Sequence, residues 1–229
     1  MSKPILLLVD GYRINDPVFD SAFSGPEFPI SVDLIERVEI VRGPGSSIYG
    51  SNALFAVVNV ITRRGADVDG LEATASVQSF DTDNERLSVG GHGSHGLDWL
   101  VSGSRYRSRG QDQYFPEFDA AATNHGLAQS VDSDRSDKAY GKISLEDFTV
   151  TGAYSRRAKQ IPTASFSTTF NDPRERTVDQ ELYVDASYAG HAGAQWEVAP
   201  HLFYGRSVYN GDYPLATLNR DETLGIWWG

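Results

Sequence analysis

The sequence contains no cysteine and only one methionine among its 229 residues. The absence of cysteine excludes disulfides, thiolate metal sites and a cysteine nucleophile. Basic residues are also scarce, with 20 Lys and Arg against 31 Asp and Glu, so the net charge is −11 and the pI is near 4.8. This acidity argues against nucleic acid as a partner, because phosphates bind basic surfaces.

Long hydrophobic runs are absent too. The longest apolar runs, Ile5–Val9 and Ala53–Val58, are far shorter than the ~18 residues of a membrane helix. A membrane β-barrel is not excluded, because its strands alternate apolar and polar residues and never produce a long run. The chain is rich in Gly (22), Tyr (11) and Phe (11), which is typical of strands and turns.

The first 65 residues predict a small α+β unit. Ile5–Val9 reads as a buried strand that ends in the turn Asp10-Gly11. Further along, the pattern predicts a helical turn, a strand, a helix and a β-branched strand at Leu34–Arg37, Val38–Val41, Ser46–Leu54 and Val57–Thr62.

A glycine-rich turn, Gly43-Pro44-Gly45-Ser46-Ser47, separates two of these elements. It is not followed by the Lys of a phosphate-binding loop, and its serines do not fit the G-x-S-x-G pattern of a hydrolase nucleophile. An enzyme that uses this turn is therefore disfavoured. The simpler interpretation is that Gly43, Gly45 and Gly50 permit positive φ angles in a connector.

The remaining residues predict eight strands with a period of two. The segments are Leu71–Val77, Arg86–Gly93, Leu97–Arg107, Tyr140–Leu145, Phe148–Tyr154, Leu182–Tyr188, Trp196–Tyr204 and Thr223–Trp228. Pro200 cannot donate to a strand ladder, so it predicts a bulge or a break in the seventh segment. Trp and Tyr near the strand ends fit an interfacial aromatic girdle, although aromatics are also good strand formers.

The connections alternate between short and long. Tight turns are expected at Ser94–Gly96, Glu146–Asp147 and Gly190–Gly193, and long polar loops at Ser108–Lys138, Arg156–Asp179 and Gly205–Asp221. Transmembrane barrels sort their loops by length in this way, with short turns on one rim and long loops on the other.

Two stretches near the N-terminus carry a specific resemblance. "ILLLVDGYRIND" and "FPISVDLIERVEIVRGPGSSIYGSNALFAVVNVITRRG" resemble the second half of the plug domain of TonB-dependent outer-membrane receptors. Eight strands cannot enclose a plug, whereas plugged transporters have about 22. We therefore expect a mainly β fragment, with the C-terminal part of a plug at residues 1–65 and the first strands of an incomplete antiparallel transmembrane β-barrel at residues 66–229.

The resemblance implies a receptor in the Gram-negative outer membrane that takes up a scarce nutrient and is not an enzyme. It implies the TonB-ExbB-ExbD complex, outer-membrane lipid and a siderophore-like ligand as partners, and no cofactor. An iron-siderophore is the leading substrate, with cobalamin or a glycan as alternatives. A stand-alone β-rich binding or adhesion protein is the alternative from another class, but it would not need "VRGPGSSIYGSNA".

Candidate substrate-binding residues lie in two places. The resemblance points to the plug loop Arg13–Gly25 and to the outer loops, where aromatic and polar side chains suit a ring-bearing, oxygen-rich ligand. The candidates are Asn15, Asp16, Phe19, Asp20, Phe23, Tyr114, Phe115 and Phe118. The plug residues could instead form a solvated connector. The loop aromatics, with Phe166 and Phe170, could instead pack the loops together.

Glu39 and Arg42 stand at the junction of strand and turn in the plug motif. The resemblance implies that they pair with charges on the barrel wall and dock the plug. No metal site is predicted, because Asp81-x-Asp83-Asn84 and Asp132-x-Asp134 lack the glycine and distal glutamate of a calcium loop and the five histidines are scattered.

Overall fold

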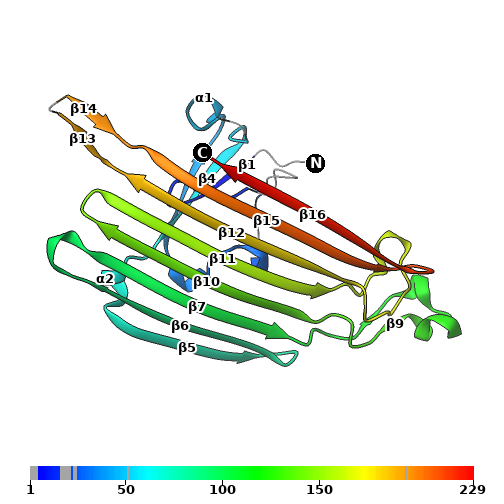
Figure 1. Cartoon of the computed structure of the whole chain (residues 1–229). Coiled ribbons are helices and arrows are strands. Elements are labelled where there is room, and N and C mark those ends of the chain that lie inside the picture. The colour runs from blue at the N-terminus through cyan, green and yellow to red at the C-terminus, as the bar shows by residue number, and fades with distance from the viewer. Residues whose placement is uncertain (1–4, 16–21, 23–24, 51, 194) are drawn as a thin grey trace.

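The computed structural model describes residues 5–15, 22, 25–50, 52–193 and 195–229. A small mixed sheet lies against one face of a broad, curved antiparallel sheet (Figure 1). We call residues 5–64, which contain the small sheet, the plug, and the eight-stranded sheet the wall. The mainly β fold class is therefore confirmed.

The plug sheet has the strand order β2-β1-β4-β3, formed by Tyr12–Arg13, Ile5–Val9, Ala56–Thr62 and Ile35–Arg42. Strand β1 runs parallel to β4 at its centre. One face of β1 packs Leu6 and Leu8 on Val57, whereas Leu7 and Val9 pack toward the wall. Because both of its faces are covered, β1 is apolar along its whole length.

Positive φ angles occur where the sequence predicts turns. Asp10 (φ 48°) and Gly11 (φ 85°) connect β1 to β2, and Gly43 (φ 102°) follows β3. Helix α1 (Ser46–Tyr49) is shorter than the predicted Ser46–Leu54. It ends because Gly50 takes a left-handed conformation (φ 77°), a common way to terminate a helix.

The wall is a meander in which each strand pairs with the next one along the chain. In chain order its strands are β5 (Gly70–Gln78), β6 (Thr82–His92), β7 (Asp98–Ser108), β10 (Asp134–Leu145), β11 (Phe148–Gln160), β12 (Arg176–Tyr188), β15 (His201–Pro214) and β16 (Leu218–Trp228). All neighbouring pairs are antiparallel, as predicted.

The two faces of the wall differ in chemistry. The face turned away from the plug exposes apolar side chains, for example Val101, Ile143, Val150 and Leu202. The face toward the plug buries polar ones, including Ser88, Ser102 and Thr151. The predicted alternation is therefore real, with the apolar side pointing outward. The predicted aromatic girdle holds only in part, because Tyr154 lies on the outer face whereas Trp227 contacts the plug.

Two predictions about the last strands are wrong. Trp196–Tyr204 is not one strand, because the chain leaves the ladder at Ala199 and Pro200. The predicted tight turn Gly190–Gly193 is instead part of a projecting hairpin, with β13 (Gly190–Ala192) paired to β14 (Trp196–Val198) (Figure 1). The loss of a backbone donor at Pro200 accounts for the break, as the sequence predicted.

The prediction of a long loop at Gly205–Asp221 is also wrong, because most of these residues belong to strands. Strands β15 and β16 continue through it and are joined by residues 215–217 alone. Polar residues dominate both faces of this hairpin, so it lacks the alternation that identifies a half-buried strand. The other two long loops exist, at residues 109–133 and 161–175; the first contains β8 (Gln113–Tyr114) and β9 (Leu127–Ala128). They lie at one end of the wall, called the long-loop end, and the opposite end is called the turn end (Figure 1).

A short helix, α2 (Gly65–Val68), joins the plug to the wall. The carboxylate of Asp98 accepts hydrogen bonds from the backbone nitrogens of Gly65 (2.7 Å) and Ala66 (2.8 Å) at the helix start. A Cβ atom at Gly65 would overlap the carbonyl oxygen of Trp99, so only glycine fits there. Among the described residues, no helix is long and apolar enough to cross a membrane.

Candidate functional site

Polar contacts hold the plug against the inner face of the wall. In three ion pairs, a plug carboxylate meets a wall cation: Asp10 with Lys142, Glu27 with Arg157 and Asp33 with Arg86. Charges removed from water need a partner, so opposite signs on the two surfaces favour docking in one arrangement.

The first pair lies at the β1–β2 turn. Lys142 Nζ donates to Asp10 Oδ2 at 3.1 Å and to Thr62 Oγ1 at 3.1 Å. Asp10 also accepts hydrogen bonds from the backbone nitrogen (2.9 Å) and hydroxyl (2.5 Å) of Thr62. The Thr62 hydroxyl oxygen lies 2.8 Å from the Tyr140 hydroxyl of the wall. One carboxylate thus connects two plug strands and strand β10.

The ion pair between Asp33 and Arg86 contains a buried guanidinium. The Arg86 side chain is only 2% exposed and donates through Nε to Asp33 at 3.1 Å. It also hydrogen-bonds Glu72 on β5 and Ser88 on its own strand. Glu72 is shared with Arg63 of the plug, at 3.2 Å. Two carboxylates therefore balance the charge of Arg86, which makes its burial tolerable.

The ion pair between Glu27 and Arg157 lies nearer the long-loop end. Arg157 donates to Glu27 at 2.7 Å and forms a two-pronged contact with Asp134 of the wall, at 3.0 and 2.7 Å. The Ser136 hydroxyl donates to the Pro26 carbonyl at 3.4 Å. These contacts fix the 3₁₀ turn Gly25–Glu27 beside β10 and β11.

A pocket of about 200 Å³ lies between this plug segment and the wall, on the long-loop side. Its lining comprises Gly25, Pro26, Ser31, Val32, Asp33, Asn84, Ser104, Tyr106, Ser136 and Lys138. A cation, the Asp33 carboxylate that pairs with Arg86, hydroxyls, an amide and one aromatic ring line it, a set that can bind a polar ligand with several oxygens. We call it the long-loop pocket.

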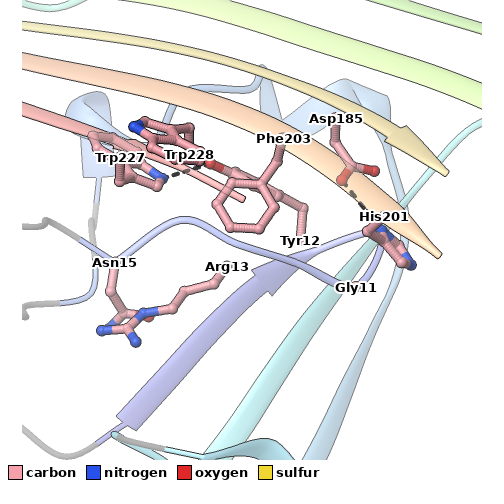
Figure 2. Close-up of a pocket in the computed structure, with 9 residues that line it drawn as sticks. All are labelled: Gly11, Tyr12, Arg13, Asn15, Asp185, His201, Phe203, Trp227 and Trp228. Atoms are coloured by element: carbon pink, nitrogen blue, oxygen red, sulfur yellow. Dashed lines mark hydrogen bonds and ion pairs between the residues drawn. The ribbon is translucent and has the colours of Figure 1, made fainter.

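A second pocket of about 530 Å³ lies at the turn end, also between plug and wall (Figure 2). Tyr12 of the plug stacks on Tyr183 at 4.9 Å between ring centroids and accepts a hydrogen bond from Trp227 Nε1 at 2.6 Å. Burial raises the pKa of Tyr12 to about 12. Across the pocket, His201 Nδ1 lies 3.2 Å from Asp185 (Figure 2).

The long loops pack on each other through an apolar cluster. Phe118 stacks on Phe170 at 4.3 Å, and Phe115 meets the same ring edge-on at 6.0 Å. Ala128, Val131 and Ala164 complete this cluster. Beneath it, the buried Glu175 accepts hydrogen bonds from Thr168 (2.7 Å) and the Ser165 nitrogen (3.0 Å), while burial raises the pKa of Glu175.

The predicted substrate residues have different environments. Tyr114 is 57% exposed on its loop, and its hydroxyl donates to Asp119 at 3.0 Å, which raises the pKa of Tyr114. Asn15 is buried and bonds β1 through Leu7 (2.9 Å) and Ile5 (2.9 Å). Asp16, Phe19, Asp20 and Phe23 lie outside the described residues.

The predicted docking residues do not contribute the observed contacts. Glu39 is exposed on β3 and accepts a hydrogen bond from Arg37 of the same strand at 2.9 Å; Arg42 is exposed at the end of that strand. Their role in docking stays a prediction. Sequence reasoning missed Asp10, Glu27 and Asp33, because no local pattern separates them from exposed carboxylates such as Glu39. Within the described residues, no group of three or more His, Cys, Asp or Glu side chains could hold a metal ion.

Comparison with known proteins agrees with this architecture. Residues 1–57 match the model of the TonB-dependent Receptor Plug Domain. A stretch of 70 residues is 47% identical to the vitamin B12 transporter BtuB of Vibrio vulnificus, covering 30% of this chain and 11% of the transporter. The N-terminal quarter of the chain therefore matches the plug domain of TonB-dependent receptors. Its homologues and structural neighbours of this family are outer-membrane proteins of Gram-negative bacteria.

Solved receptors share the fold of nearly the whole chain. The ferric enterobactin receptor PfeA of Pseudomonas aeruginosa aligns with a TM-score of 0.62 at 15% identity, covering 97% of this chain and 37% of the receptor. The ferric citrate transporter FecA aligns with a TM-score of 0.62 at 18% identity, covering 99% of this chain and 34% of the transporter. The chain thus spans about a third of these receptors, and their fold is what it shares with them.

Proposed function

We propose that this chain is the plug–wall unit of a receptor that imports a scarce nutrient across the outer membrane with energy from TonB, ExbB and ExbD. The observation that carries the proposal is the set of plug–wall ion pairs, three of which join a plug carboxylate to a wall cation, beside a pocket between plug and wall. The pairs hold the plug in place at rest, and their separation would open a path along the wall. Residues 1–65 and 66–229 are the parts that we assign to plug and barrel.

An iron-siderophore is the substrate class that the long-loop pocket supports best. Lys138 offers a positive charge, and Asn84, Ser104 and Tyr106 offer hydrogen-bonding groups around it. Ferric siderophores present many oxygens and often a negative charge, which such groups bind. A solved relative of 17% identity is a PfeA mutant in complex with enterobactin. Exposed Tyr114 is the loop residue that we assign to first contact with the ligand.

Cobalamin is the second candidate, because the 47% identity is to a vitamin B12 transporter. That identity covers only 30% of the chain, so it bears less on the substrate than the pocket does. Phe115 and Phe118 are proposed to shape the loops rather than to touch ligand, since both contact Phe170.

Binding of ferric enterobactin and of cyanocobalamin to the complete receptor would test the proposal. We expect ferric enterobactin to bind, and Lys138→Gln to weaken it about tenfold through loss of a charge-assisted contact. Arg220→Gln is the matched control, since Arg220 is exposed and pairs with Asp212 outside the pocket. Tight binding of cyanocobalamin alone would replace the substrate assignment. Iron uptake that is unchanged in a strain without TonB would refute the transport role.

A further inference from the structure

Two tyrosines of the wall occupy equivalent positions on either side of Ala153. Tyr140 on β10 and Tyr183 on β12 are both register partners of Ala153 on β11. All three side chains belong to the apolar cluster that joins the wall to the plug, and Tyr140 and Tyr183 are only 4% and 3% exposed. The plug therefore covers two phenol groups in closely similar surroundings.

The hydroxyl groups of these two tyrosines differ in their hydrogen bonds. The Tyr140 hydroxyl lies 2.8 Å from Thr62 Oγ1 of the plug. Thr62 in turn bonds the Asp10 carboxylate and the Lys142 ammonium group. The Tyr183 hydroxyl oxygen is fully buried but has no hydrogen-bond partner in the part of the chain that the structure describes. A buried hydroxyl without a partner is unfavourable, because it has lost the hydrogen bonds that it makes with water.

The plug is what separates the Tyr183 hydroxyl from water. Tyr12 of the plug stacks on the Tyr183 ring at 4.9 Å between centroids, and Leu7 and Val9 of β1 belong to the same apolar cluster. These contacts stabilise the ring, but they offer nothing to its hydroxyl. Water reaches the hydroxyl only when β1 and Tyr12 move away from the wall. The unfavourable term therefore belongs to the docked plug and disappears on separation.

We propose that the Tyr183 hydroxyl opposes plug docking and so keeps the plug able to leave the wall during transport. Phenylalanine at this position would fill the same space and keep the stack on Tyr12, so packing at rest does not require the hydroxyl. The ion pairs and the Tyr140 contact hold the plug, and Tyr183 offsets part of their effect. The role in transport rests on the proposed function, whereas the effect on docking does not.

Hydrogen exchange of the β1 and β4 amides in the complete receptor tests the effect on docking. Tyr183→Phe should slow this exchange about tenfold, because it removes an unpaired buried hydroxyl and no hydrogen bond. Tyr140→Phe is the matched control: the same chemical change at the equivalent position removes the contact with Thr62 and should speed exchange about fivefold. The double variant should lie between the two single variants.

Uptake of ferric enterobactin, or of cyanocobalamin if that is what the receptor binds, tests the role in transport. Tyr183→Phe should lower the uptake rate at saturating ligand without changing ligand affinity, which a merely structural residue would not do. Uptake that does not depend on TonB would refute the proposed function and leave the exchange result intact. A normal uptake rate together with slower exchange would overturn the role of Tyr183 in a TonB-dependent receptor.

Heat-modifiable gel mobility shows whether each variant is folded. Exchange in folded Tyr183→Phe that equals or exceeds the parent rate would overturn the proposal, because the hydroxyl would then have a partner in the docked state, such as an ordered water. Failure of Tyr183→Phe to reach the folded form would overturn it too, since the hydroxyl would then support the structure rather than oppose docking.

Discussion

The ion pair between Asp10 and Lys142 permits a quantitative test of plug docking. Their side chains are 18% and 13% exposed, and Asp10 also accepts two hydrogen bonds from Thr62. Asp10→Asn removes the charge at nearly constant size, and Lys142→Met removes the ammonium group while keeping an unbranched apolar side chain. Each change leaves the other charge partly buried and unpaired.

The expected magnitude follows from that geometry. Breaking a fully buried pair costs about 3–5 kcal/mol, and a hydrogen bond to a charged group contributes about 1.5–3 kcal/mol. Because both groups retain some contact with water, we expect each single variant to lose about 2 kcal/mol of docking free energy. That corresponds to a roughly 30-fold rise in the opening equilibrium. The double variant should cost little more than either single one, since the pair is already broken.

Hydrogen exchange of the β1 and β4 amides in the complete receptor measures this opening. Both strands should exchange about 30-fold faster in each single variant. Arg37→Gln serves as the control, because its partners Glu36 and Glu39 are exposed on β3 and such pairs contribute under about 1 kcal/mol. If the effects of Asp10→Asn and Lys142→Met simply add in the double variant, the two residues are not coupled and the reasoning is wrong.

Three further predictions concern the linker and the loops. Gly65→Ala should loosen the linker, because its Cβ would overlap the Trp99 carbonyl; faster proteolysis between plug and wall would show it. Phe170→Ala should destabilise the packed loops by about 3 kcal/mol, measured as faster amide exchange in residues 109–133, and unchanged exchange would contradict this. The Arg174 hydrogen bond lowers the pKa of Asp172, so this contribution to loop stability is present above the unfolded pKa of ~3.9 and is lost as pH falls through the lower folded value. Exchange in residues 161–175 should therefore rise in acid, and Arg174→Gln should abolish that rise.

The sequence predicts those parts of the fold that depend on local pattern. Alternation identifies the outer face of β11, from Phe148 to Tyr154, because one side of the strand is apolar and the other polar. The apolar run Ile5–Val9 predicts a strand covered on both faces. Alternation fails to identify the β15–β16 hairpin. The half of this hairpin nearer the long-loop end is polar on both faces, so its sequence resembles a loop.

The docking contacts were beyond sequence reasoning for a different reason. Asp10 and Lys142 are 132 residues apart, and Glu27 and Arg157 are 130 apart. Nothing local distinguishes Glu27 from Glu39, which is equally charged but pairs within its own strand. What distinguishes them is the position of the wall, which depends on the registers of β10 and β11 and on the Asp98 contact with the linker. Plug–wall recognition is thus a property of the assembled sheet, and the signs of the charges on the two surfaces acquire their meaning only there.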